Sequence, residues 1–204
     1  MARQPDTRQP DPFSALRGSN RISSSRALEV HELTQTNISR IRKCHCTLPY
    51  ADEFKKHYLF YDSYTGAQAW KKIGGNIDEE YGANGPNGTQ NSCAARVSYG
   101  LNYSGKLIKP SSPGANRNFL DSKRYIISAR KMREYLRQIA GKPDFTLTSL
   151  DDFNKLKSAL MHDDVFIMVA TGHATVVTMN YQDDYATSYL GDVWLLPTRK
   201  CNCG

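Results

Sequence analysis

The chain has 204 residues, and its 27 Lys and Arg against 20 Asp and Glu give a formal net charge of +7. This length suffices for one domain with a sizeable core and a short appendage. Basic residues are dispersed among acidic ones, without a run of five like charges or the Arg and aromatic pattern of nucleic-acid-reading modules. We therefore expect no direct nucleic-acid binding, although the positive charge favours some anionic partner.

The first part of the chain is polar and rich in Arg, Pro and Ser. It contains no apolar segment long enough for a signal peptide or a membrane span, so we expect no membrane insertion. We divide the chain into a polar, mobile extension at residues 1–48 and a folded domain at residues 49–204.

Two C-x-C pairs lie near the two ends of that domain. Disulfides between the pairs would tie the ends together in an oxidising compartment, whereas four thiolates, with His45, could instead bind zinc. The one-residue gap is short for zinc, so we favour disulfides and expect no metal. The four disulfide candidates are Cys44, Cys46, Cys201 and Cys203.

The segment 51–70 has the spacing of a helix that turns Phe54, Tyr58 and Tyr61 toward the core. Trp70 follows at its end, before a Gly-Gly turn. Aromatic residues at this spacing are core residues by default, but we assign Trp70 to the lining of a substrate cleft.

Cys93 stands between a loop rich in Gly and Asn and a helical stretch at residues 94–101. A thiol at a helix start faces unpaired N–H groups and the positive end of the helix dipole, which favour the thiolate. We expect an apolar face formed by Ala94, Val97, Tyr99 and Leu101, with Arg96, Ser98 and Asn102 pointing elsewhere. Gly105 suits the end of this helix. Cys93 is therefore a candidate nucleophile, although a single cysteine is also often an inert core residue.

Further along, the chain indicates two helices and then strands. Residues 129–140 have helical spacing between Ser128 and Gly141, and Ser149 with Asp152 resembles a capping box for a second helix. Strands are expected at 165–170, 173–179 and 192–196. Helices first and an antiparallel sheet last make an α+β fold, with the nucleophile at a helix N-terminus packed on the sheet.

A cysteine nucleophile needs a base, and His173 is the candidate because it opens a β-branched strand. The histidines His31, His45, His57 and His162 lie in polar surroundings and are interpreted as solvated. A carboxylate should orient the imidazole, and two adjacent ones follow the strand. We choose Asp184, with Asp183 as the reserve; either could instead be a turn residue.

Five sequence blocks occur in a specific order: KKIGGNI at 71–77, NSCAARVSYGLNYSG at 91–105, GKPD at 141–144, GHAT at 172–175 and VWLL at 193–196. With these blocks, residues 55–196 resemble the peptidoglycan amidase effectors of the bacterial type VI secretion system, fourth amidase class. These effectors have an NlpC-like, papain-like cysteine peptidase fold. The loop 78–90 and the residues before 49 depart from this pattern.

The resemblance implies a secreted antibacterial toxin that acts in the periplasm of a target cell, where it hydrolyses peptidoglycan stem peptides between D-glutamate and meso-diaminopimelate. It implies an immunity protein and the type VI secretion machinery as partners, and no cofactor. By position, Cys93 matches the nucleophile, His173 the base and a residue near Asp184 the orienting group. We add Asn91 and Ser92 as substrate-binding candidates, and the Cys93 N–H as an oxyanion donor.

Two other functions stay open from the residues alone. A Cys/His site also serves deamidase or transglutaminase-type toxins that modify a protein, because the acyl-enzyme step is shared. A binding module stabilised by metal at the C-x-C pairs, with an unreactive Cys93, is the non-enzymatic alternative.

Overall fold

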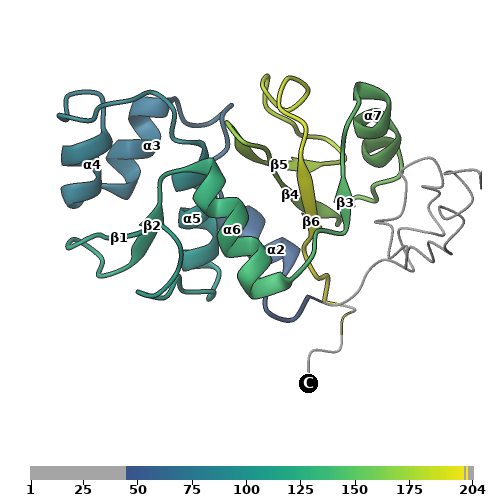
Figure 1. Cartoon of the computed structure of the whole chain (residues 1–204), viewed down its shortest axis with the longest axis horizontal. Coiled ribbons are helices and arrows are strands. Elements are labelled where there is room, and N and C mark those ends of the chain that lie inside the picture. Colours follow the sequence, from purple (N-terminus) through teal and green to yellow (C-terminus); the bar gives the residue numbers. More distant parts are fainter. Residues whose placement is uncertain (1–44, 200, 202–204) are drawn as a thin grey trace, which may run out of the picture.

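The computed structural model describes residues 45–199 and 201. Figure 1 shows a four-stranded sheet with α7 on one side, and α3, α4, α5 and the β1–β2 hairpin on the other side of the molecule, with α6 between them. The helices are α2 (Ala51–His57), α3 (Gly66–Ile73), α4 (Gly75–Tyr81), α5 (Cys93–Tyr103), α6 (Ala129–Ala140) and α7 (Leu150–Ser158). The strands are β1 (Ala115–Arg117), β2 (Arg124–Ile126), β3 (Phe145–Thr146), β4 (Val165–Val169), β5 (Ala174–Thr178) and β6 (Asp192–Leu195).

The larger sheet is antiparallel, in the order β3-β6-β4-β5. Alternate residues of β4 point to its two faces, as the two-residue period of a strand requires. Ile167 packs with α2, α5 and α6 on one face, whereas Phe166 packs with α7 on the other. Both faces of the sheet are covered, and the α+β fold class is confirmed.

Helix α5 lies at the centre of the molecule. It belongs both to the cluster against the sheet and to a second cluster with α3, α4 and β2, and its residues from Cys93 to Asn102 are all buried. The prediction that its polar residues point away from the core is therefore wrong. Ser98 Oγ accepts from the Ile126 N–H at 2.9 Å, and Asn102 Nδ2 donates to the Arg124 carbonyl at 2.7 Å. Ser98 and Asn102 can be buried because they bind backbone groups of β2, and Arg96 is buried with other partners.

The other predicted elements differ in how well they match. The helix at 129–140 and the Ser149/Asp152 capping box are confirmed, and Gly105 takes a positive φ of 88° just after α5. The helix expected at 51–70 is divided into α2 and α3, because the chain is extended at Tyr58 and a Thr65 capping box starts α3.

Packing begins before the expected boundary at residue 49. His45 Nε2 lies 2.8 Å from Asp144 Oδ1, so the prediction of a solvated His45 is wrong, and Leu48 is a core residue. The rest of the predicted extension, at residues 1–44, lies outside the described residues. None of the described helices is long and apolar enough to cross a membrane.

Cys46 and Cys201 are each disulfide-bonded, while Cys44 and Cys203 lie outside the described residues. Since disulfide sulfurs are not available as thiolate ligands, these two residues favour disulfides over the zinc alternative. Within residues 45–199 and 201, no group of three or more His, Cys, Asp or Glu side chains is placed to hold a metal ion.

Candidate active site

Cys93 is the first residue of α5, as the sequence predicts, and is 2% exposed. It follows a loop that Trp70 holds in place, since the Trp70 Nε1–H donates to the Thr89 carbonyl at 2.6 Å. Trp70 itself is fully buried, so its assignment to a cleft lining is wrong. The indole instead fixes the loop that leads into Cys93.

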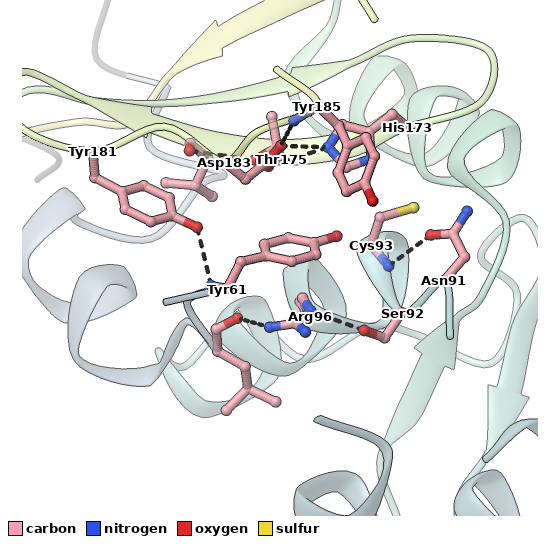
Figure 2. A network of polar contacts seen from close by, with 12 residues as sticks. Tyr61, Asn91, Ser92, Cys93, Arg96, His173, Thr175, Tyr181, Asp183 and Tyr185 are labelled. Atoms are coloured by element: carbon pink, nitrogen blue, oxygen red, sulfur yellow. Dashed lines mark hydrogen bonds and ion pairs between the residues drawn. The ribbon is translucent and has the colours of Figure 1, made fainter. Parts of the chain in front are cut away.

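His173 directly precedes β5, and its imidazole lies between Cys93 and a carboxylate (Figure 2). Its Nε2 is 3.1 Å from Asp183 Oδ2 and 3.2 Å from Asp183 Oδ1. Because an ionised carboxylate only accepts hydrogen bonds, Nε2 carries the hydrogen. Nδ1 is therefore the atom that can exchange a proton with the thiol of Cys93.

The carboxylate at the imidazole is Asp183 and not Asp184, which corrects the choice made from the sequence. Asp183 is 4% exposed and also accepts hydrogen bonds from the Thr175 hydroxyl and, at 2.8 Å, from the Tyr185 N–H. Asp184 is exposed. The burial of Asp183 against His173 and the exposure of Asp184 decide between the two neighbouring carboxylates.

The surroundings of His173 and Asp183 favour the charged forms of these two groups. Burial by itself would lower the pKa of His173, but hydrogen bonds to Asp183 and Cys93 and the charges of these groups raise it from 6.5 to about 9. Burial opposes ionisation of Asp183, yet its hydrogen bonds to His173 and Thr175 keep the pKa of this carboxyl below its ordinary value. The imidazole is thus stabilised as an imidazolium beside the thiol.

A pocket of about 290 Å³ opens at His173. Asn91 and His173, which lie on either side of Cys93 in Figure 2, both line it. Its lining residues are Tyr61, Gln90, Asn91, Gly172, His173, Tyr185 and Tyr189. A space of this size beside a nucleophile and a base fits a segment of a peptide substrate.

The two substrate-binding candidates before Cys93 differ. Asn91 is exposed in the pocket, and its Oδ1 accepts a hydrogen bond from the Cys93 N–H at 3.2 Å. Ser92 is 1% exposed, and its Oγ accepts from Arg96 Nε at 2.8 Å. Ser92 therefore holds Arg96 and does not contact a substrate, which corrects its assignment.

Arg96 is a buried cation one turn after Cys93. Its guanidinium donates to the Leu59 carbonyl at 2.6 Å and the Tyr64 carbonyl at 2.7 Å, and lies 3.8 Å from the centre of the Tyr61 ring. These contacts fix the segment that carries Tyr61 into the pocket (Figure 2).

Thr175, Arg96 and the pocket tyrosines were given no role in the site from the sequence. A signal for Thr175 was present, because residues i and i+2 of a strand share a face and Thr175 stands two residues after His173. Arg96 and Tyr61 meet only through the fold, so no local spacing indicates their contact.

Residues 89–195 of the chain match the family described as "Type VI secretion system (T6SS), amidase effector protein 4". Among curated proteins, none matches the sequence. Solved structures of Tae4 effectors do match. The effector Tae4 from Salmonella typhimurium, in complex with the immunity protein Tai4 from Enterobacter cloacae, is 25% identical, with a TM-score of 0.55 over 73% of this chain and 99% of that chain.

The Salmonella typhimurium Tae4/Tai4 effector–immunity structure gives 25% identity and a TM-score of 0.53 over the same shares of the two chains. The free Tae4 effector from Enterobacter cloacae is 21% identical, with a TM-score of 0.51, and covers 74% of this chain and 97% of its own. That last likeness shows the fold. The family match spans more than half of the sequence and includes both Cys93 and His173. The chain therefore belongs to the type VI secretion system amidase effector 4 family, the peptidoglycan-degrading hydrolases that this secretion system delivers to the periplasm of target bacteria.

Proposed function

We propose that Cys93, His173 and Asp183 carry out the amidase reaction of this effector. The observation that carries the proposal is the position of the His173 imidazole, which is hydrogen-bonded to the Asp183 carboxylate through Nε2 and to the Cys93 thiol. The nucleophile therefore contacts its base, and the base contacts the group that orients it.

In the first step, His173 Nδ1 takes the proton of Cys93 and the thiolate attacks the amide carbonyl carbon. The tetrahedral intermediate collapses when Nδ1 returns its proton to the departing amine, which leaves a thioester on Cys93. His173 then deprotonates a water molecule that attacks the thioester, and the thiol regains its proton as the acid product leaves. Asp183 holds the imidazole in the required tautomer throughout.

The negative oxygen of the intermediate needs a donor, and the Cys93 N–H at the start of α5 is suitably placed. In the structure this N–H donates to Asn91 Oδ1. The Asn91 side chain therefore has to turn away when the substrate carbonyl arrives, which is open to it because the residue is exposed.

The bond we propose is the one between the γ-carboxyl of D-glutamate and meso-diaminopimelate in the stem peptide. The resemblance of the Cys93 and His173 blocks to fourth-class amidase effectors supports this choice. Because the linkage is an amide, it fits the acyl-transfer chemistry above without any cofactor.

Digestion of purified meso-diaminopimelate peptidoglycan, with fragment identification by mass spectrometry, tests both the bond and the residues. We expect the parent protein to release fragments cut at the D-glutamyl bond and Cys93→Ala to release none. Cleavage at a different bond would overturn the substrate assignment, and cleavage by Cys93→Ala would overturn the nucleophile.

Expression with and without a periplasmic leader separates this function from modification of a cytosolic protein. A peptidoglycan amidase should be toxic with the leader and harmless without it. Toxicity without a leader would instead favour the deamidase or transglutaminase type of reaction.

We further propose that a dedicated immunity protein inhibits this effector in the producing cell. Support comes from the similar Tae4 effectors, which were solved in complex with Tai4 immunity proteins.

We also propose that the residues before the packed domain form a separate extension, whose removal should leave peptidoglycan cleavage intact.

A further inference from the structure

Two exposed tyrosines stand beside the catalytic imidazole. The Tyr185 ring centre lies 5.8 Å from that of His173, and the Tyr189 ring centre lies 5.6 Å from it. Tyr185 is 56% exposed and Tyr189 is 43% exposed. Both side chains line the pocket. Large rings exposed in a concave site beside catalytic groups mark surface that a ligand would cover.

Backbone hydrogen bonds and a buried residue hold the segment that carries these two rings. The Tyr185 N–H donates to Asp183 at 2.8 Å, and the N–H of Tyr189 donates to the Tyr185 carbonyl at 3.1 Å. Ala186, between them, is fully buried in the cluster under α7. The carboxylate that orients His173 therefore also anchors the turn that carries both rings.

The Tyr189 ring lies over Gly172, the residue before His173. A Cβ added at Gly172 would come within 3.1 Å of Tyr189 Cε1, which is tighter than ordinary contact. The ring thus packs directly on the backbone at the base, and it forms one side of the pocket while Gln90 and Asn91 contribute amides.

The chemistry of the lining indicates which part of a substrate fits. Among the described residues that line the pocket there is no Lys, Arg, Asp or Glu, and three of the seven are tyrosines. Aromatic faces stabilise ligands mainly by contact with apolar groups, while phenols and amides can bind peptide N–H and C=O groups. Such a lining suits the methyl or methylene groups and backbone amides of a peptide.

We propose that Tyr185 and Tyr189 form a specificity-determining aromatic wall, which packs against an aliphatic group of the stem peptide next to the scissile bond. The inference rests on the proposed function and deepens it, because it assigns residues to substrate selection. These tyrosines hold the substrate and take no part in proton transfer.

Steady-state kinetics on soluble stem peptides tests the wall. We expect Tyr185→Ala and Tyr189→Ala each to raise KM about five- to tenfold and to change kcat less than about twofold. The Phe variants, which keep the ring, should recover most of the lost affinity. Phe119→Ala is the matched control, since Phe119 is an aromatic residue 69% exposed and outside the pocket lining.

Alkylation by iodoacetamide separates a substrate role from damage to the site. The alanine variants should alkylate at Cys93 at the parent rate, because Cys93, His173 and Asp183 are unchanged. A fall in kcat together with slower alkylation, and with KM unchanged, would overturn the wall and assign the tyrosines to the support of His173.

Substrate variants identify the contacted group. Replacing L-alanine before D-glutamate, or D-alanine after diaminopimelate, by glycine removes one methyl group. For the alanine that packs on the wall, we expect the parent to lose several-fold in kcat/KM and Tyr189→Ala to lose little. Equal sensitivity of parent and variant to both replacements would overturn the proposal. An active Cys93→Ala would instead refute the proposed function, so the two failures are distinguishable.

Discussion

At the scale of single residues, two neighbouring carboxylates differ in a way that a paired substitution can measure. Asp183 is buried against His173 Nε2, whereas Asp184 is exposed. We expect Asp183→Asn to lower kcat by about 10²- to 10⁴-fold, because an amide can stabilise the wrong tautomer and no longer supports the imidazolium. Asp184→Asn, the matched control, should stay within about twofold. Equal losses of kcat in Asp183→Asn and Asp184→Asn, measured in the peptidoglycan assay, would refute Asp183 as the orienting group.

The titration of His173 gives a second prediction. Since its pKa is raised from 6.5 to about 9, the stability that the imidazolium contributes is fully present below pH 6.5 and is lost as the pH rises through 9. The gap in unfolding free energy between the parent and His173→Gln should therefore narrow over that range. An NMR titration of His173 should show a midpoint near pH 9 in the parent. In Asp183→Asn this midpoint should lie at a lower pH. A midpoint near 6.5 in the parent would contradict this coupling.

Asn91 gives a third prediction, because its amide oxygen holds the proposed oxyanion donor. In Asn91→Asp a carboxylate would bind the Cys93 N–H more strongly and repel the developing oxyanion. We expect kcat/KM to fall about 100-fold, as it does when an oxyanion donor is lost, while Asn91→Ala should lose less than about tenfold. Asn154→Asp, on exposed α7 surface, controls for the added charge. Equal activity of the Asp and Ala variants would exclude this role.

At this scale, the sequence predicts those site residues whose positions depend on their neighbours in the chain. The block around Cys93 and the strand-opening His173 indicated the nucleophile and the base, because helix starts and strand patterns depend on neighbouring residues. The choice between Asp183 and Asp184 depends on how the chain turns after β5, where a bridge joins Thr178 and Tyr181. That geometry is fixed by tertiary packing, so two adjacent aspartates look alike in the sequence.

At the scale of elements, α5 is positioned by a cation that the chain buries completely. Arg96 joins α5 to the segment between α2 and α3 through the Leu59 and Tyr64 carbonyls. Arg96→Met would leave these acceptors without a donor, and we expect the unfolding free energy in urea to fall by about 3–5 kcal/mol. Arg130→Met, an exposed change on α6, should cost less than about 0.5 kcal/mol. A loss as small as that control would mean that Arg96 is not needed to hold α5.

Helix ends that are marked by capping residues could be predicted from the sequence, whereas those that depend on tertiary packing could not. The start of α7 follows from a capping box, and the end of α6 from Gly141, because both signals lie within a few residues of the boundary. The end of α2 has no such signal at Tyr58, which is extended and buried, whereas the start of α3 has one in the Thr65/Gln68 capping box. For α5, amphipathic spacing predicted that Arg96, Ser98 and Asn102 point away from the core, but β2 binds Ser98 and Asn102, and the segment between α2 and α3 binds Arg96.

At the scale of the whole molecule, one contact between layers creates the site. Cys93 belongs to the helical layer, whereas His173 directly precedes the edge strand β5 of the sheet and Asp183 lies in the segment that follows this strand. The cluster of apolar residues shared by α5, β4 and β5 holds these layers together. Any change that loosens this packing should separate the nucleophile from its base before it unfolds either layer.

Cys46 and Cys201 are each disulfide-bonded, so the stability of the domain should depend on the redox state of the compartment in which the toxin acts. Cys46 precedes α2 and Cys201 follows β6, so the two bonded cysteines lie at the two ends of the domain. We expect reduction to lower the unfolding free energy by about 2–5 kcal/mol, which calorimetry with and without a reductant would measure. A variant with Ser at Cys44, Cys46, Cys201 and Cys203 should show no response to the reductant, because Cys93 is a free thiol. Unchanged stability of the reduced parent would show that the bonds are dispensable. A loss of stability would mean that the domain reaches full stability only in an oxidising compartment, such as the periplasm that contains its substrate.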